Sequence, residues 1–357
     1  MNYRVLYIVF SLLIISCSDE YDDNWNYIDN FPPPVILEGK RIMENEFANI
    51  DIYTVQSHII ISTMRDTLFH VYDKNLEYLG SFGNRGRGPY EFPQVALIRD
   101  AISYDDTLIV FAIDLASNKK YGIDLLETLV SGEMKVFNEH ELHWDLYGAY
   151  FFYTIDEEMI VGTYRDQFYQ RLDGNYGLFY YNPGNDSVVT VPLHNLDILT
   201  NEGLPVNDPS ARMNINSHAS AISPDRSKIA TIMFYTPRLE VFHIGEHSSS
   251  QLYLKPENVN EKYDLDTFYR GDITVYYNDI HVTDEYIYFL YSGHKEAEDE
   301  IRSLEKIIQV IDWNGNPHRQ YIIPSRYDIT VFTVDEDNGH IYGLSHPKDA
   351  IYKFPFQ

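Results

Sequence analysis

The chain has 357 residues, of which 15% are aromatic, and this aromatic content excludes global disorder. Its formal net charge is −27, and such a surface repels phosphate backbones, so nucleic acid is excluded as a partner. A single cysteine excludes an intrachain disulfide framework, and the many Tyr and Phe residues favour strands because flat rings suit a pleated, half-buried surface.

The first 16 residues have the pattern of a signal peptide. Arg4 supplies a positive start, and residues 5–15 are apolar except for Tyr7 and Ser11. At about 1.5 Å per residue this stretch is too short for a hydrocarbon core of about 30 Å. It has instead the length and composition of the apolar region of a signal peptide.

The segment Ile14-Ile15-Ser16-Cys17 resembles the bacterial lipobox, and Cys17 is the only cysteine. The resemblance implies cleavage before Cys17 and lipidation of this residue, with two or three acyl chains giving a stable membrane anchor. The alternative is an ordinary secretion signal with a coincidental cysteine. The acidic run that follows, 18–23, resembles the surface-export signal of Bacteroidetes lipoproteins. We therefore expect an outer membrane lipoprotein on the cell surface rather than one that faces the periplasm.

Three parts of the chain are expected: a signal peptide at 1–16, a tether at 17–34 and one folded domain at 35–357. The tether is acidic at its start and ends in three consecutive prolines, Pro32 to Pro34. Prolines stiffen the chain toward polyproline II and lack the donors that a sheet needs.

From about residue 35, short aromatic and β-branched runs alternate with turn residues, which predicts repeated hairpins. Asn182 to Asn185 form one predicted turn, and Asn314-Gly315 lie in another, where both residues accept a positive φ. The predicted strands are 58–62, 67–72, 78–80, 107–112, 120–123, 159–163, 176–181, 228–233, 239–244, 286–291, 307–312, 329–334, 340–344 and 350–354.

About six such units fit the mature length, so the predicted fold is all-β, a six-bladed β-propeller of four-stranded antiparallel blades. A two-sheet sandwich is the structural alternative, but it would need two domains, and no linker separates them. Helical signal is confined to the windows 123–135 and 296–308.

Two stretches resemble a known family. Residues 79–92 (LGSFGNRGRGPYEF) are similar to the G-x-x-G-x-G-P-x-E-F segment of the TolB-like six-bladed propeller lipoproteins of Bacteroidetes. Residues 221–230 (AISPDRSKIA) resemble the S-P-D-G blade motif of TolB-type propellers, with Arg226 where glycine is usual. The resemblance implies a fold and an exported location, and says little about activity.

The glycine-rich segment is the best ligand-facing candidate. Its order, G-x-x-G-x-G, differs from a dinucleotide-binding loop, and no Lys-Ser/Thr pair follows as in a P-loop. The plainer interpretation is an inter-blade loop whose glycines permit positive φ. Arg85 and Arg87 are rare positive charges here, and we expect them to hold an anionic group or a partner's carboxylate. The structural residues of this loop are Gly83, Gly86, Gly88, Pro89, Glu91 and Phe92.

None of the three acidic or histidine-rich motifs in the chain predicts a metal site. His140 and His143 are three residues apart, where a zinc helix needs four. Residues 335–339 lack the ligand spacing of an EF-hand, and a hairpin turn explains them better. The acidic run 296–300 is expected to be a solvated loop or the start of a helix. We expect no cofactor.

The predicted function is a membrane-anchored binding or scaffold module with an unknown protein or glycan partner. No G-x-S-x-G nucleophile elbow is present, and a lipidated Cys17 leaves no thiol nucleophile. The alternative is a metal-dependent hydrolase or lyase whose dispersed carboxylates meet in the central channel, because such sites have no local spacing.

Overall fold

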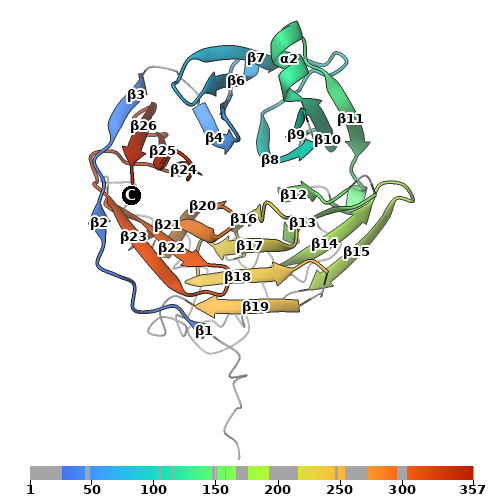
Figure 1. Cartoon of the computed structure of the whole chain (residues 1–357). Coiled ribbons are helices and arrows are strands. Elements are labelled where there is room, and N and C mark those ends of the chain that lie inside the picture. The colour runs from blue at the N-terminus through green and yellow to red at the C-terminus, as the bar shows by residue number, and fades with distance from the viewer. Residues whose placement is uncertain are drawn as a thin grey trace, which may run out of the picture.

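Six β-sheets are arranged radially around a central axis in the computed structural model, so the chain is a six-bladed β-propeller, as predicted (Figure 1). The structure describes residues 26–44, 49–104, 106–114, 116–146, 149, 151–156, 158–165, 176–192, 216–245, 248–253, 272–295 and 304–356. Each blade has four antiparallel strands in chain order from the axis outward, except that the last takes its outermost strand from the start of the chain.

The first three blades follow one another along the chain. Blade 1 contains β4 (Asn49–Val55), β5 (His58–Thr63), β6 (Thr67–Asp73) and β7 (Tyr78–Asn84). Blade 2 contains β8 (Ala96–Tyr104), β9 (Thr107–Asp114), β10 (Lys119–Asp124) and β11 (Val136–Glu141). Blade 3 contains β12 (Phe151–Thr154), β13 (Ile160–Arg165), β14 (Tyr176–Asn182) and β15 (Ser187–Pro192).

The remaining blades complete the ring. Blade 4 contains β16 (His218–Ile222), β17 (Lys228–Met233), β18 (Arg238–His243) and β19 (Ser248–Tyr253). Blade 5 contains β20 (Thr274–Val282), β21 (Tyr286–Lys295), β22 (Lys306–Asp312) and β23 (Pro317–Ile323). Blade 6 contains β24 (Val331–Asp335), β25 (His340–Ser345), β26 (Ala350–Pro355) and β3 (Lys40–Glu44).

The hydrophobic pattern of each strand follows its place in the blade. All six residues of β5 are buried, because the second strand of a blade is covered on both faces by neighbouring blades. The outermost strand β11 instead alternates between half-buried and exposed residues. This difference explains why the middle strands are near-continuous apolar runs in the sequence, while the outer strands are harder to recognise.

The N-terminal segment closes the ring. Strand β3 pairs antiparallel with β26, so the first described part of the chain completes the last blade. Before it, β1 (Asn26–Tyr27) and β2 (Val35–Ile36) add short parallel strands to the outer edges of β19 and β23 (Figure 1). The predicted tether at 17–34 therefore overlaps the fold from Asn26 onward.

One of the two predicted helical windows is confirmed. Helix α2 (Leu125–Ser131) is capped by the Asp124 side chain, which accepts a hydrogen bond from the Glu127 N–H, and it ends at Gly132 with φ 72°. In the second window, the helix prediction is wrong for residues 306–308, which belong to strand β22. Residues 296–303 of this window lie outside the described residues. The only 3-10 helix among the described residues is η1 (Trp144–Leu146). No helix in the described part of the chain is long and apolar enough to cross a membrane.

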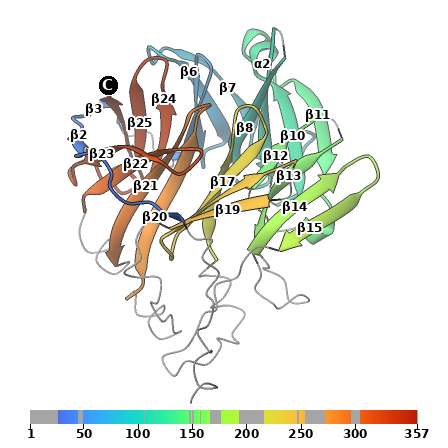
Figure 2. The same ribbon diagram turned by 60° about the horizontal axis from the view of Figure 1, so that its bottom comes forward.

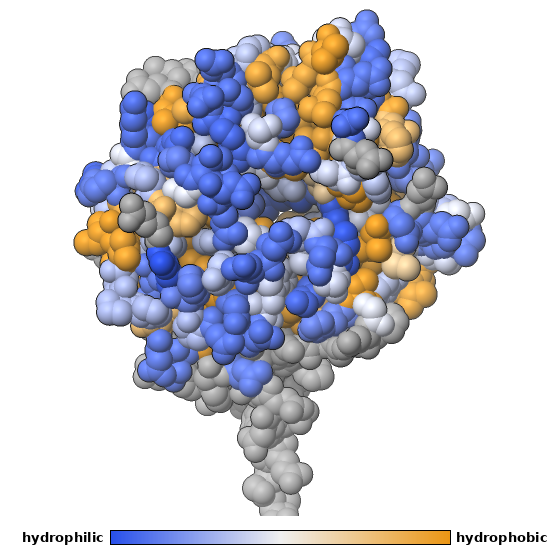
Figure 3. All heavy atoms as spheres, viewed as in Figure 1, coloured by the Kyte–Doolittle hydropathy of each residue, from blue (hydrophilic) through white to orange (hydrophobic). Residues whose placement is uncertain are grey.

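The two faces of the ring differ in their connections. The turns that follow the six inner strands all lie on one face, together with the connection that carries α2, and we call this the upper face after its place in Figure 2. Figure 3 looks onto this face and shows hydrophilic side chains around the centre of the ring.

Candidate functional site

A cavity of about 650 Å³ lies on the axis and opens at the upper face. Its wall comes mainly from five of the six inner strands, β4, β8, β16, β20 and β24, and from the turns that follow them. The volume lies within the range of small-molecule sites, which is about 300–1,000 Å³. Because the wall belongs to five different blades, the cavity exists only when the ring is closed.

β-Bulges place three buried aspartates beside the axis. The pairing of β4 with β5 shifts register just before Asp51, that of β8 with β9 just before Asp100, and that of β20 with β21 just before Asp279. A bulge bends a strand and re-aims its side chains. The three carboxylates are almost fully buried, and a buried charge must be paired or hydrogen-bonded.

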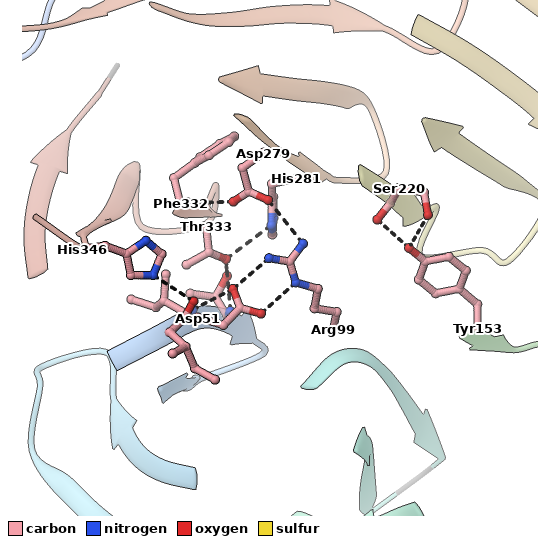
Figure 4. A network of polar contacts seen from close by, with 12 residues as sticks. Asp51, Arg99, Tyr153, Ser220, Asp279, His281, Phe332, Thr333 and His346 are labelled. Carbon is pink, nitrogen blue, oxygen red and sulfur yellow. Dashed lines mark hydrogen bonds and ion pairs between the residues drawn. The ribbon is translucent and has the colours of Figure 1, made fainter. Parts of the chain in front are cut away.

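Arg99 on β8 meets two of these carboxylates across the axis (Figure 4). Its Nε and Nη2 donate to the two oxygens of Asp51 at 2.7 and 3.1 Å, and its Nη1 donates to Oδ1 of Asp279 at 3.3 Å. Asp51 lies near the start of β4, whereas the cavity opens where β4 ends. The guanidinium therefore lies toward the inner end of the cavity, and it joins blades 2, 1 and 5.

The same polar side chains connect neighbouring blades. Asp100 accepts a hydrogen bond from the Thr154 N–H at 2.9 Å, and Asp279 accepts one from the Phe332 N–H at 2.9 Å. Each bond links one inner strand to the next around the ring. Thr333 continues the pattern, because its hydroxyl accepts from the Thr54 N–H at 3.1 Å. The buried ring of polar groups thus has a clear structural role.

Burial and pairing shift the pKa values of these groups in opposite directions. Burial raises the pKa of Asp279 to about 6, although the neighbouring Arg99 opposes this rise. Burial would also lower the pKa of Arg99, but Asp51 and Asp279 together raise it. Burial lowers the pKa of His281 to about 4, with a further contribution from Lys74. At neutral pH, Arg99 is therefore charged and His281 is neutral.

Arg226 forms a second link, from blade 4 to blade 2. It lies in the turn after β16 with φ 62°, a conformation that glycine adopts more readily than other residues. Its guanidinium donates to Asp100 and to the carbonyl oxygen of Ala101. The inner strand of blade 3, β12, has only four residues, and Arg226 of blade 4 contacts blade 2 directly. The arginine at position 226, where glycine is usual, thus adds a direct link between blades 4 and 2.

Lys120 lies behind Asp100 and is fully buried. Its Nζ is 3.3 Å from Asp100 Oδ2, donates to the Thr154 hydroxyl, and sits 4.1 Å from the centre of the Phe111 ring. Burial lowers the pKa of Lys120 to about 8, while Asp100 opposes this. Burial would raise the pKa of Asp100, but Arg226 and Lys120 hold it below its usual value.

The glycine-rich loop lies away from this cavity. It joins β7 to β8 and therefore belongs to the face opposite the upper face. Gly83 has φ 75°, and a Cβ at Gly86 would clash with the carboxylate of Glu91, whose Oε2 accepts from the Gly88 N–H at 2.7 Å. Phe92 is fully buried and packs edge-on against Phe69.

The two arginines of this loop are not part of the cavity wall. Arg85 is exposed and donates through Nη1 to the Met64 carbonyl oxygen at 3.1 Å, and Arg87 is also exposed. Any ligand that they hold would bind at a separate surface.

The acidic and histidine-rich motifs form ordinary structural elements. Glu139 to Glu141 lie in strand β11, and 335–339 form the hairpin turn between β24 and β25, as expected. Among the residues that the structure describes, no three or more His, Cys, Asp or Glu side chains group as metal ligands. Cys17 and the acidic run 296–300 lie outside the described residues.

Sequence reasoning missed the polar residues at the axis. A signal for them exists in the sequence: Asp51, Asp100 and Asp279 each interrupt an otherwise largely apolar stretch, and each is followed by Ile or Ala. A charged residue inside an otherwise apolar strand indicates a buried partner. The identity of the partner could not be read in this way.

The comparisons with known proteins agree with this architecture. Residues 213–337 match the model of a family described as TolB-like 6-blade propeller-like, which confirms the resemblance to TolB-like propellers over this part of the chain. No curated protein matches the sequence.

Two solved structures from Bacteroides are similar over nearly the whole chain. A Bacteroides fragilis protein described as exported covers 92% of this chain and 97% of its own length, with 11% identity and a TM-score of 0.55. A Bacteroides vulgatus member of the DUF4221 family covers 91% and 99%, with 9% identity and a TM-score of 0.60. At these identities the likeness shows the fold.

Proposed function

We propose that this chain is an exported, lipid-anchored binding protein that holds a small ligand in the axial cavity of its propeller. The observation that carries the proposal is the cavity itself, which is preformed by five blades and has Arg99 in its wall. Its aspartates and arginines are held in fixed pairs between blades, which suits binding by a rigid site. Cys17 would supply the anchor, and a protein or glycan partner could contact the broad upper face.

The metal-dependent hydrolase or lyase considered from the sequence is not favoured by any observation. The buried aspartates that meet at the axis hold arginine guanidinium groups and backbone N–H groups. We therefore argue for binding alone.

A thermal-shift screen of small-molecule fractions from a bacterial extract tests ligand binding. A ligand that binds only the folded state stabilises it, by about 2.7 kcal/mol at 100 times its Kd, and should raise Tm by a few degrees. We expect one fraction to stabilise the wild-type chain but not the double variant Lys74→Gln, Arg226→Gly, which alters the cavity wall. The double variant Arg85→Ala, Arg87→Ala should keep the response. Loss of the response in this second variant alone would move the site to the glycine-rich loop. If none of the fractions stabilises the wild-type chain, the proposal is contradicted.

Replacement of Cys17 by Ser should release the protein from membranes. The serine cannot be acylated as the lipobox chemistry requires, so the protein loses its two or three acyl chains. We expect the wild-type protein in the membrane fraction with an incorporated palmitate label, and the variant without label in the soluble fraction. Protease treatment of intact cells would then test surface exposure, because full protection would contradict it. Equal palmitate labelling of both proteins would show that Cys17 is not the lipidated residue.

A further inference from the structure

Three cations of the cavity wall are more exposed than the buried carboxylates with which they pair. The Arg99 side chain is 26% exposed, whereas Asp51 and Asp279 behind it are 3% and 4% exposed. The Lys74 side chain is 16% exposed and its partner Asp335 3%. In the third pair, Arg226 is 15% exposed and Asp100 3%. The guanidinium and ammonium groups of these pairs are therefore more accessible to a ligand than their carboxylate partners are.

Ion pairs on the outer surface leave both partners exposed. Lys119 and Glu139 are 33% and 34% exposed, Lys295 and Asp272 are 53% and 50%, and Arg326 and Glu38 are 55% and 71%. In these pairs the carboxylate is about as exposed as the cation or more so, whereas the carboxylates paired in the cavity wall are buried. The paired cations of the cavity wall thus offer accessible positive charge inside an opening that is lined by carboxylates.

The arginine at the inner end retains hydrogen-bonding capacity. A guanidinium has five N–H donors, and Arg99 directs three of them to Asp51 and Asp279. Lys74, in the turn after β6, stands in the same wall, with its Nζ 2.9 Å from Asp335. Arg226 comes from the turn after β16. Donors from three blades therefore converge on one cavity, and hydrogen bonds from such charged donors to an oxyanion are among the strongest.

We propose that this cavity binds a small anionic molecule, which places a carboxylate, phosphate or sulfate group against Arg99 with Lys74 and Arg226 beside it. This inference rests on the proposed binding function and names the chemical class of its ligand.

The acidic rim of the cavity restricts this ligand to a compact anion. Asp284, Glu336 and Asp337 line the opening and are exposed, so they repel an approaching negative charge. At physiological ionic strength such repulsion is screened over about 8 Å, which a small ion can tolerate. A polyanion would keep many charges near the rim and is excluded.

Calorimetric titration of the full-length chain, purified in detergent at pH 7 and low salt, tests the inference. The probes are inorganic phosphate, sulfate and citrate, with glycerol as an uncharged control. Saturable binding of at least one anion and none of glycerol is expected. Tighter binding of phosphate or sulfate would indicate a tetrahedral oxyanion, and tighter binding of citrate a carboxylate. Absence of saturable binding by all three anions would overturn the inference.

Two single variants locate the site. Lys74→Gln and Arg226→Gly should each weaken binding of the tightest anion by roughly tenfold or more, since each removes a charged donor. Glycine suits the positive φ at position 226, and Asp100 keeps its bonds to Lys120 and Thr154, so this variant should fold. Arg326→Gln removes the same charge at the outer surface and should leave affinity unchanged.

The outcome of these variants separates the two proposals. Equal weakening by all three variants, or by none, would overturn the inference, because binding would then be nonspecific or located elsewhere. If the ligand found by the thermal-shift screen is uncharged yet depends on the cavity residues, the binding function stands and the anionic class fails.

Discussion

Replacing Arg99 with Met should lower the free energy of unfolding by about 3–5 kcal/mol at pH 7, which is the usual cost of removing one partner from a buried ion pair. The variant would leave Asp51 and Asp279 buried without their shared cation. It would also remove the bonds that join three blades across the axis. Urea unfolding followed by circular dichroism measures this change.

Arg326→Met is the matched control for this experiment. Arg326 also pairs with a carboxylate, that of Glu38, but both side chains are more than half exposed. Exposed pairs contribute about 0–1 kcal/mol, so this variant should unfold almost as the wild type does. Equal stability of the two variants would show that the ion pairs of Arg99 across the axis do not stabilise the propeller.

The loss caused by Arg99→Met should depend on pH. The pKa of Asp279 is raised from 3.8 to about 6 in the folded chain, mainly by burial. The stability that its protonation contributes is therefore present below pH 3.8 and is lost as the pH rises through about 6. Without Arg99 the charged form loses its nearest cation, so this pKa rises further. The difference between variant and wild type should thus be largest at pH 7 and smaller near pH 5, and a constant difference would contradict this account.

Removal of residues 1–44 should destroy the cooperative unfolding of the propeller, whereas removal of residues 1–25 should not. The longer deletion takes away β3, which pairs with β26, and Leu37, which is buried in the core between blades 5 and 6. Strand β26 would then present an unpaired edge, which promotes aggregation. The shorter deletion leaves β1, β2 and β3 in place.

Thermal unfolding and size-exclusion chromatography measure both deletions. We expect the shorter chain to melt within a few degrees of wild type as a monodisperse species, and the longer deletion to elute as aggregates. The substitution Gly39→Val tests closure at a single position, because a Cβ there would clash with the buried Phe354 ring and destabilise the chain. A cooperative, wild-type-like transition after removal of residues 1–44 would contradict the role assigned to β3.

Much of the fold could be predicted because strand and turn signals are local. The predicted strand 228–233 coincides with β17, and 286–291 starts where β21 starts. The middle strands of a blade are the easiest to recognise, since both their faces are buried. Strand β11, with its alternating exposure, was not predicted because its hydrophobic signal is weak. Strand β12 was not predicted because it has only four residues, although they are apolar or β-branched. Strand β1, which lies within the range predicted as a tether, has only two residues, too few to give a strand pattern in the sequence.

The amino-acid sequence by itself determined the class of fold, the repeated hairpins and the glycine-rich loop, because each depends on residues a few positions apart. Only the tertiary structure decided the cavity and its charges. Arg99 lies 48 residues from Asp51 and 180 from Asp279, and Arg226 lies 126 from Asp100. No local pattern relates residues so far apart, and their pairing arises only when closure of the ring brings the inner strands to one axis.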